Sequence, residues 1–206
     1  MQRFDDPVQF YRSAKLAVIS AGFEKEIEWQ ASRCPDQITP EEFLSEAAWV
    51  IINSGFREAV ARRLFPAITL CFCDWEAAEI ARSAVGCRAA ALTVFAHAGK
   101  IDAIIDIAMK VDSDWPALRN RIAEQPLERL RALPFIGPIT ASHLAKNLGY
   151  GVAKADRHLV RTANTWGCGS VQALCDRIAL ATGDPVGVVD LVLWRHAVES
   201  KRALAA

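Results

Sequence analysis

The chain has 206 residues, enough for one large domain or two small ones that bury a sizeable core. Hydrophobic residues make up 52% of it and charged residues 23%, the balance of an ordinary globular protein. Its 24 basic and 24 acidic residues cancel, so overall charge does not indicate a nucleic-acid partner, and no apolar run reaches the roughly 18 residues of a membrane span.

The cysteines and the N-terminal residues indicate the compartment. The six cysteines lack the spacing of a disulfide framework, and the first residues lack the basic and apolar regions of a secretion signal. We therefore expect a cytoplasmic protein with reduced thiols, not associated with a membrane. Cys168 and Cys175 are seven residues apart, but no further cysteine follows at cluster spacing, so we expect no iron–sulfur cluster and no other cofactor.

Helical periodicity dominates the sequence, which predicts an all-α fold of roughly ten or more short helices. Thr39-Pro40-Glu41-Glu42 is a helix start, and that helix ends at Ser54-Gly55. Ser170 opens a helix that reaches Gly183, and Asp184-Pro185 opens a C-terminal one with Val188, Leu191, Val192 and Trp194 on its apolar side. Other helices are predicted at about 57–72, 75–85, 88–98, 101–110, 115–123 and 126–132.

The stretch from Leu130 to Gly149, LRALPFIGPITASHLAKNLG, predicts two helices joined by a tight turn at Pro134-Phe135-Ile136-Gly137-Pro138. Gly137 lets the backbone approach a ligand closely, and the free N–H groups of the second helix's first turn form an anion site. A phosphate could be held there by the main chain. A purely structural αα-hairpin is the alternative interpretation.

Asp156 follows within VAKADRHLVR, where it is expected to cap a helix. It is the single acid between Arg129 and Arg161, a range that also holds six bases, Arg129, Arg131, Lys146, Lys154, Arg157 and Arg161. This local charge is compatible with a polyanionic partner, although a solvated basic face is the alternative. A carboxylate kept ionised by cations and helix-end amides can activate water or stabilise a developing cation.

The pairing of LPFIGPITASHLAKNLG with VAKADRHLVR resembles the helix-hairpin-helix, Gly/Pro-rich loop and aspartate signature of the DNA glycosylase superfamily that includes endonuclease III. A-S-H-L-x-x-N-L-G and D-R-H-x-x-R are most similar to its microbial 8-oxoguanine branch. The resemblance implies one glycosylase domain over residues 1–206, with a helix-hairpin-helix at about 126–149. Its two helical subdomains would flank a cleft.

The resemblance also implies a mechanism, a monomeric protein and a double-stranded DNA partner. A damaged or mispaired base is flipped out of the duplex, and Asp156 stabilises the sugar cation or positions water as the glycosidic bond breaks. Carbonyl groups of Arg131, Leu133 and Ile136 would hold a sodium or potassium ion. The implied DNA contacts are Pro134, Phe135, Ile136, Gly137, Pro138, Thr140, His158 and Arg161.

Three further residues resemble those around the flipped base. Trp194 lies in a D-L-x-L-W run like the helix that closes the base pocket. Asn53 and Arg57 follow the Thr39 helix, where family members fill the gap that the base leaves. A helix C-cap at Asn53-Ser54-Gly55 is the alternative for that segment.

The sequence departs from the pattern at two positions. Ile139 stands where bifunctional members carry the lysine that forms a Schiff base, so we expect a monofunctional glycosylase. A bifunctional glycosylase/lyase using Lys146 or Lys154 and a non-catalytic DNA-binding protein are the alternatives. Phe135 stands where the family has glycine, and because a bulky ring disfavours positive φ, we expect an altered hairpin or a ring that wedges into DNA.

Overall fold

The computed structural model describes residues 6–205, and the side chains of residues 6–200. Every regular element in this range is a helix, which confirms the all-α prediction. The helices form two compact units, as predicted, here called unit 1 (residues up to Cys34 and from Ala145 onward) and unit 2 (Pro35–Leu144). No described helix is both long and apolar enough to cross a membrane.

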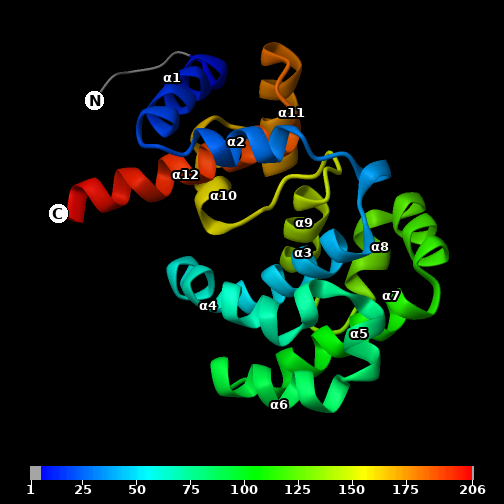
Figure 1. The fold of residues 1–206 in the computed structure, drawn as a ribbon. Coiled ribbons are helices and arrows are strands. Elements are labelled where there is room, and N and C mark those ends of the chain that lie inside the picture. Colours follow the sequence, from blue (N-terminus) through cyan, green and yellow to red (C-terminus); the bar gives the residue numbers. More distant parts are fainter. Residues whose placement is uncertain (1–5, 206) are drawn as a thin grey trace. The chain divides into compact units, whose positions relative to one another are not determined.

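Unit 1 joins the two ends of the chain (Figure 1). Its helices are α1 (Pro7–Ser20), α2 (Glu24–Ala31), α10 (Arg157–Thr165), α11 (Val171–Thr182) and α12 (Val186–Ala205). Tyr11, Leu174, Ile178 and Val192 are buried in its core, with at most 1% of each side chain exposed. Helix α11 begins and ends as predicted, since Ser170 caps it through Ala173 N–H and Gly183 ends it at φ 79°.

Asp184 differs from its expected role as a helix start. Helix α12 begins at Val186, and the Asp184 carboxylate instead accepts hydrogen bonds from Tyr11 Oη at 2.6 Å and Lys15 Nζ at 2.8 Å, both on α1. Burial and this contact raise the pKa of Tyr11. The aspartate therefore ties α1 to the segment before α12, a long-range contact that sequence spacing does not reveal.

Unit 2 contains α3 (Pro40–Asn53), α4 (Glu58–Cys71), α5 (Ala77–Arg82), α6 (Ala84–Val94), α7 (Ala98–Glu124) and α8 (Pro126–Arg131), with short 3-10 turns η1 (Pro35–Gln37) and η2 (Cys73–Trp75). Thr39 and Glu42 form a capping box at the start of α3. The apolar face of α3 packs on α7, whose Ile101, Ile104 and Ile107 are fully buried. Helix α9 (Pro138–Asn147) runs from unit 2 into unit 1.

Helix α7 contains the expected break between helices at 101–110 and 115–123, in the form of a kink at Asp114. It spans 27 residues, and its irregularity is confined to Asp114, with φ −164° and ψ 79°. Asp114 accepts a hydrogen bond from Ala117 N–H at 3.0 Å. Pro116 has no N–H group, so it needs no hydrogen-bond acceptor at the kink. Asp114 therefore caps the second segment of α7 at the kink. Helix α6 begins four residues before the predicted 88.

Gly149 ends α9 with φ +90°, and its N–H donates to Lys146 O at 3.0 Å. A Cβ atom at this position would lie 2.7 Å from the carbonyl oxygen of Arg33. Both the backbone conformation and the available space therefore require glycine.

We predict that Gly149→Ala lowers the free energy of unfolding by about 2–5 kcal/mol, from backbone strain and overpacking together. Gly183→Ala is the matched control, because Gly183 also has positive φ but no atom within 4 Å of its Cβ position. Urea unfolding of both variants measures the difference, and equal losses would show that the contact with Arg33 contributes nothing.

Candidate functional site

The predicted turn between two helices is present in unit 2. Helix α8 ends at Arg131 and α9 begins at Pro138, with Ile136 N–H donating to Leu133 O at 3.2 Å across the turn. Leu133 and Ile136 are buried and anchor the turn. Gly137 and Pro138 are exposed.

The first turn of α9 leaves backbone donors free. Ala141 N–H donates to Gly137 O at 2.8 Å, whereas the N–H groups of Ile139 and Thr140 form no hydrogen bond with a described residue. Free amides at a helix N-terminus attract an anion, and the helix dipole adds to this attraction. The geometry of this segment therefore suits a phosphate.

Phe135 adopts the left-handed conformation, with φ 60°, in spite of its bulky side chain. The turn thus follows the course that a glycine would allow, at a cost of about 1–2 kcal/mol in backbone strain. The ring is 47% exposed and meets the His97 ring edge-on at 5.7 Å. Gly99 makes room for it, because a Cβ there would lie 3.1 Å from Phe135 Cε2.

The turn also offers carbonyl oxygens to a cation. The oxygens of Arg131 and Ile136 accept no backbone hydrogen bond within the described residues, while that of Leu133 accepts one. Because a carbonyl oxygen has two lone pairs, each of the three keeps at least one lone pair beyond the backbone hydrogen bonds of the described residues. Among the described residues, no three His, Cys, Asp or Glu side chains gather to hold a metal.

Asp156 caps α10 in unit 1, as expected. Its Oδ1 accepts hydrogen bonds from His158 N–H at 2.8 Å and Leu159 N–H at 3.1 Å. Its Oδ2 forms no hydrogen bond with a described residue, and the side chain is half-buried. One oxygen therefore fixes the carboxylate on the helix dipole, and the other remains available for chemistry.

Asp190 on α12 contacts the segment that leads into Asp156. It is 1% exposed, its Oδ1 lies 3.1 Å from Lys146 Nζ, and its Oδ2 accepts a hydrogen bond from Lys154 N–H at 2.7 Å. The carboxylate thus ties the end of α9 and the segment before α10 to α12. Sequence reasoning treated Asp190 only as part of the D-L-x-L-W run, although a single acid among apolar residues of one helix was a signal for a buried ion pair.

The two candidate lyase lysines differ in their surroundings. Lys146 is 6% exposed, and its amine is paired with the buried Asp190 carboxylate, away from solvent. Lys154 is half-buried, and its backbone N–H is committed to the same carboxylate. Ile139, which stands where the resemblance places a lysine in bifunctional glycosylases, is 56% exposed.

Gln30 is a buried polar residue that the sequence did not single out. It is 3% exposed, and its Nε2 donates to Lys146 O at 2.9 Å. Its Oε1 is buried without a hydrogen-bond partner among the described residues. Gly187 allows this close approach, because a Cβ there would lie 2.8 Å from Gln30 Nε2.

The other predicted contacts of unit 1 lie on α10 and α12. His158 is half-buried and Arg161 is exposed on α10. Trp194 is half-buried on α12, with the guanidinium of Arg195 stacked 4.7 Å from its ring. These two side chains stack, so a base at Trp194 would meet the ring face that Arg195 does not cover.

The predicted gap-filling residues lie in unit 2, at the end of α3. Asn53 is the last residue of α3 and is half-buried, Ser54 caps the helix, and Arg57 is exposed. Lys100, which the sequence did not single out, donates from Nζ to Ile52 O at 3.3 Å and to Ser54 O. Its side chain is buried, and burial lowers the pKa of the amine.

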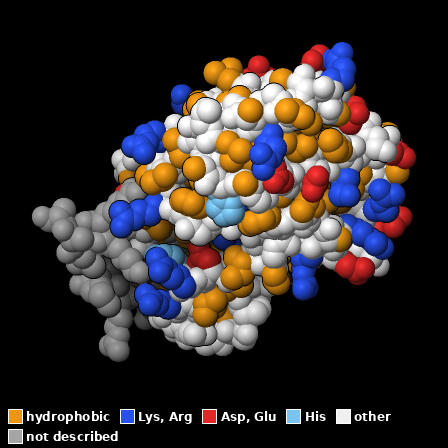
Figure 2. Space-filling model, turned by 90° about the horizontal axis from the view of Figure 1, so that it is seen from below, with side chains coloured by type: hydrophobic (Ala, Val, Ile, Leu, Met, Phe, Trp, Pro, Cys, Tyr) orange, Lys and Arg blue, Asp and Glu red, His pale blue; other side chains and the backbone are white. Residues whose placement is uncertain are grey.

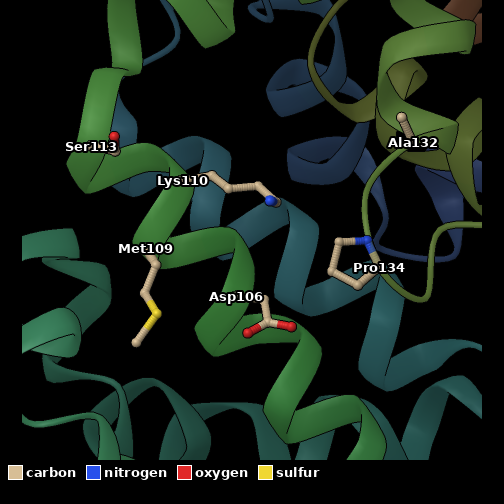
Figure 3. A pocket seen from close by; sticks show the side chains of 6 residues that line it. All are labelled: Asp106, Met109, Lys110, Ser113, Ala132 and Pro134. Carbon is tan, nitrogen blue, oxygen red and sulfur yellow. The ribbon is translucent and has the colours of Figure 1, made fainter.

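A hollow of about 710 Å³ lies beside the turn of unit 2 (Figure 3). Four side chains from α7 and two residues of the turn region line it: Asp106, Met109, Lys110, Ser113, Ala132 and Pro134. It contains one amine and one carboxylate, and Pro134 is its sole predicted site residue. The hollow therefore carries no separate chemistry of its own.

Comparison with known proteins supports the fold of this chain and no finer assignment. No protein-family model and no curated protein sequence matches the chain. Among solved structures, the chain is similar to the 8-oxoguanine DNA glycosylase of Thermotoga maritima, Tm1821, with a TM-score of 0.60 and 19% identity. The match covers 92% of this chain and 96% of the other. The chain therefore shares the fold of a DNA glycosylase over nearly its whole length.

We predict that Lys146→Met lowers the free energy of unfolding by about 3–5 kcal/mol, because it leaves the Asp190 carboxylate buried without its cation. Asp190→Asn is predicted to cost a similar amount, since it strands the amine.

The double variant is predicted to cost clearly less than the sum of the two, because no buried charge remains and the asparagine can still accept from Lys154 N–H. Urea unfolding of all four proteins gives the coupling energy. A coupling near zero would contradict the ion pair.

Proposed function

We propose that the chain is a DNA glycosylase of base-excision repair that hydrolyses the bond between a flipped base and its sugar. The observation that carries the proposal is the Asp156 carboxylate, with Oδ1 held by two helix-end amides and Oδ2 not bonded to any residue that the structure describes. Its position in the D-R-H-x-x-R motif and the fold shared with Tm1821 support the same function.

The proposed reaction follows from charge. As the glycosidic bond breaks, its electrons leave with the base and positive charge develops on the sugar. An ionised carboxylate stabilises that charge and orients the water that completes hydrolysis. No hydrogen-bond donor of the described residues contacts Asp156 Oδ2, so this oxygen is available to the sugar cation and the water.

Double-stranded DNA is the proposed substrate, held by the turn of unit 2. The free amides of Ile139 and Thr140 would bind a phosphate, and a sodium or potassium ion on the carbonyls of Arg131, Leu133 and Ile136 would add positive charge beside it. We propose that the protein acts in the cytoplasm. We also propose that it acts as a monomer, because all the residues assigned to these contacts belong to one chain.

The proposed base pocket uses Trp194 and Gln30 of unit 1. A buried acceptor without a partner is costly, and an N–H group of a bound base would satisfy Gln30 Oε1. Trp194 offers a face for stacking. The fold shared with an 8-oxoguanine glycosylase makes 8-oxoguanine the first base to test.

We propose that the glycosylase is monofunctional. A lyase step needs an unprotonated amine that reaches the sugar. Ile139 provides none, and the Lys146 amine is held by Asp190. The abasic site would then leave the enzyme with its strand intact.

We predict that the protein releases base from at least one duplex in a panel that carries 8-oxoguanine, uracil, alkylated purines and mismatches. Strand cleavage after alkali reveals each abasic product. Binding of duplex without release of any base across the panel would show a DNA-binding protein that is not a glycosylase.

We predict that Asp156→Asn slows single-turnover excision about 100-fold or more, because the charge that stabilises the sugar cation is lost. Asparagine caps helices as well as aspartate, so stability and duplex affinity should stay near those of the wild type.

Asp176→Asn is the control, since it removes an equal charge from the exposed face of α11 in the same unit. Retained excision by Asp156→Asn would remove Asp156 from the reaction.

A further inference from the structure

An aromatic row in unit 2 joins the turn that the proposed function assigns to DNA with the loop after α3, where the sequence predicted gap-filling residues. The Phe56 and Phe95 rings meet at 5.1 Å, Phe95 stacks on His97 at 6.1 Å, and His97 meets Phe135 at 5.7 Å. Phe56 lies in the loop after α3, and Phe135 lies in the turn before α9. The row therefore runs from one loop to the other within a single unit.

The two ends of the row are exposed, and its middle is not. Phe56 is 44% exposed and Phe135 47%, whereas Phe95 is 5% exposed and His97 is half-buried. On the face of the molecule that Figure 2 shows, hydrophobic side chains reach the surface in small groups between charged ones. Phe56 and Phe135 are half-exposed, and each ring contacts another aromatic ring of the row.

Neighbouring residues hold both ends of the aromatic row in place. Lys100 lies with its Nζ 4.7 Å from the Phe56 ring and 5.8 Å from the Phe95 ring, and the same Nζ holds the carbonyl oxygens at the end of α3. At the other end, Phe135 is kept at φ 60° and its ring fills the space that Gly99 leaves. Backbone strain at an exposed aromatic residue is retained where the ring's position matters.

The positively charged side chains near the row are complementary to a polyanion. Arg57 follows Phe56 directly, and Arg129 and Arg131 lie on α8, which leads into the Phe135 turn. All three are exposed, and none forms an ion pair with a described residue. Apolar rings flanked by unpaired arginines suit unstacked bases between phosphates better than a protein surface.

We propose that Phe56 and Phe135 form a two-ring contact surface for the unstacked nucleotides of a distorted DNA duplex, with His97 and Lys100 as positioning residues. The inference rests on the proposed function for its ligand. It adds a stacking surface, independent of charge, to the phosphate contacts of the turn. When a nucleotide leaves the duplex, its neighbours lose a stacking partner, and aromatic faces replace part of that loss.

The test measures the affinity of Phe135→Gly for a duplex that carries a stable tetrahydrofuran abasic-site analogue and for the same duplex undamaged. Glycine removes the ring and relieves the strain at φ 60°, so the variant should unfold no more easily than the wild type. We expect about a tenfold loss of affinity for the abasic duplex, within the range of one base–aromatic stack. The loss for the undamaged duplex should be smaller.

Salt dependence separates stacking from charge. Phe135→Gly should leave the slope of log affinity against log salt unchanged, whereas Arg131→Gln should reduce it. Phe135→Tyr keeps the ring and should bind like the wild type. Leu70→Ala, which removes an exposed apolar side chain from α4 in the same unit, is the matched control and should bind unchanged.

Lys100→Met tests the positioning role. It keeps the volume of the side chain and removes the donor, so it should weaken abasic binding while Lys100→Arg restores part of it. Wild-type affinity for the abasic duplex in Phe135→Gly, or equal losses for both duplexes, would overturn the inference. If the wild type releases no base but its preference for the abasic duplex still depends on Phe135, the proposed glycosylase function fails and the contact surface stands.

Discussion

The buried ion pair between Lys146 and Asp190 is the interaction on which the candidate site of unit 1 depends. One carboxylate joins the last turn of α9, the segment before α10 and the N-terminal part of α12. The first of these segments carries Lys146, the second leads into Asp156, and the third carries Trp194. Because breaking a buried pair strands a charge, each segment is held in place by a penalty larger than that of an ordinary hydrogen bond.

The same pair shapes the chemistry. The Lys146 amine is paired with a buried carboxylate, and Ile139 places no amine at the other candidate position on α9. The proposed catalytic group is a carboxylate on a helix N-terminus, with one oxygen that forms no hydrogen bond within the described part of the chain. That arrangement stabilises positive charge and does not form an imine. In unit 2, the free amides of α9 and the exposed rings of Phe56 and Phe135 supply recognition, by charge and by stacking respectively.

Local signals predicted much of this structure. The helix start at Thr39, the Ser170 cap with Gly183, and the Asp156 cap are each defined within a few residues, and all three are present. The features that sequence reasoning missed are contacts between distant segments. Asp184 with α1, Asp190 with Lys146, and Lys100 with the end of α3 join residues that no spacing rule relates. Phe135 shows the reverse case, in which tertiary packing against His97 and Gly99 overrides a local preference against positive φ.

The central claim is that excision relies on the Asp156 carboxylate and proceeds without a covalent amine intermediate. Borohydride reduction during incubation with an abasic-site duplex tests it most directly, since reduction converts any imine between protein and DNA into a permanent crosslink. The account predicts no crosslinked species on a denaturing gel, while a known bifunctional glycosylase run in parallel gives one. A crosslink that forms with the wild type and disappears in Lys154→Ala or Lys146→Ala would contradict it.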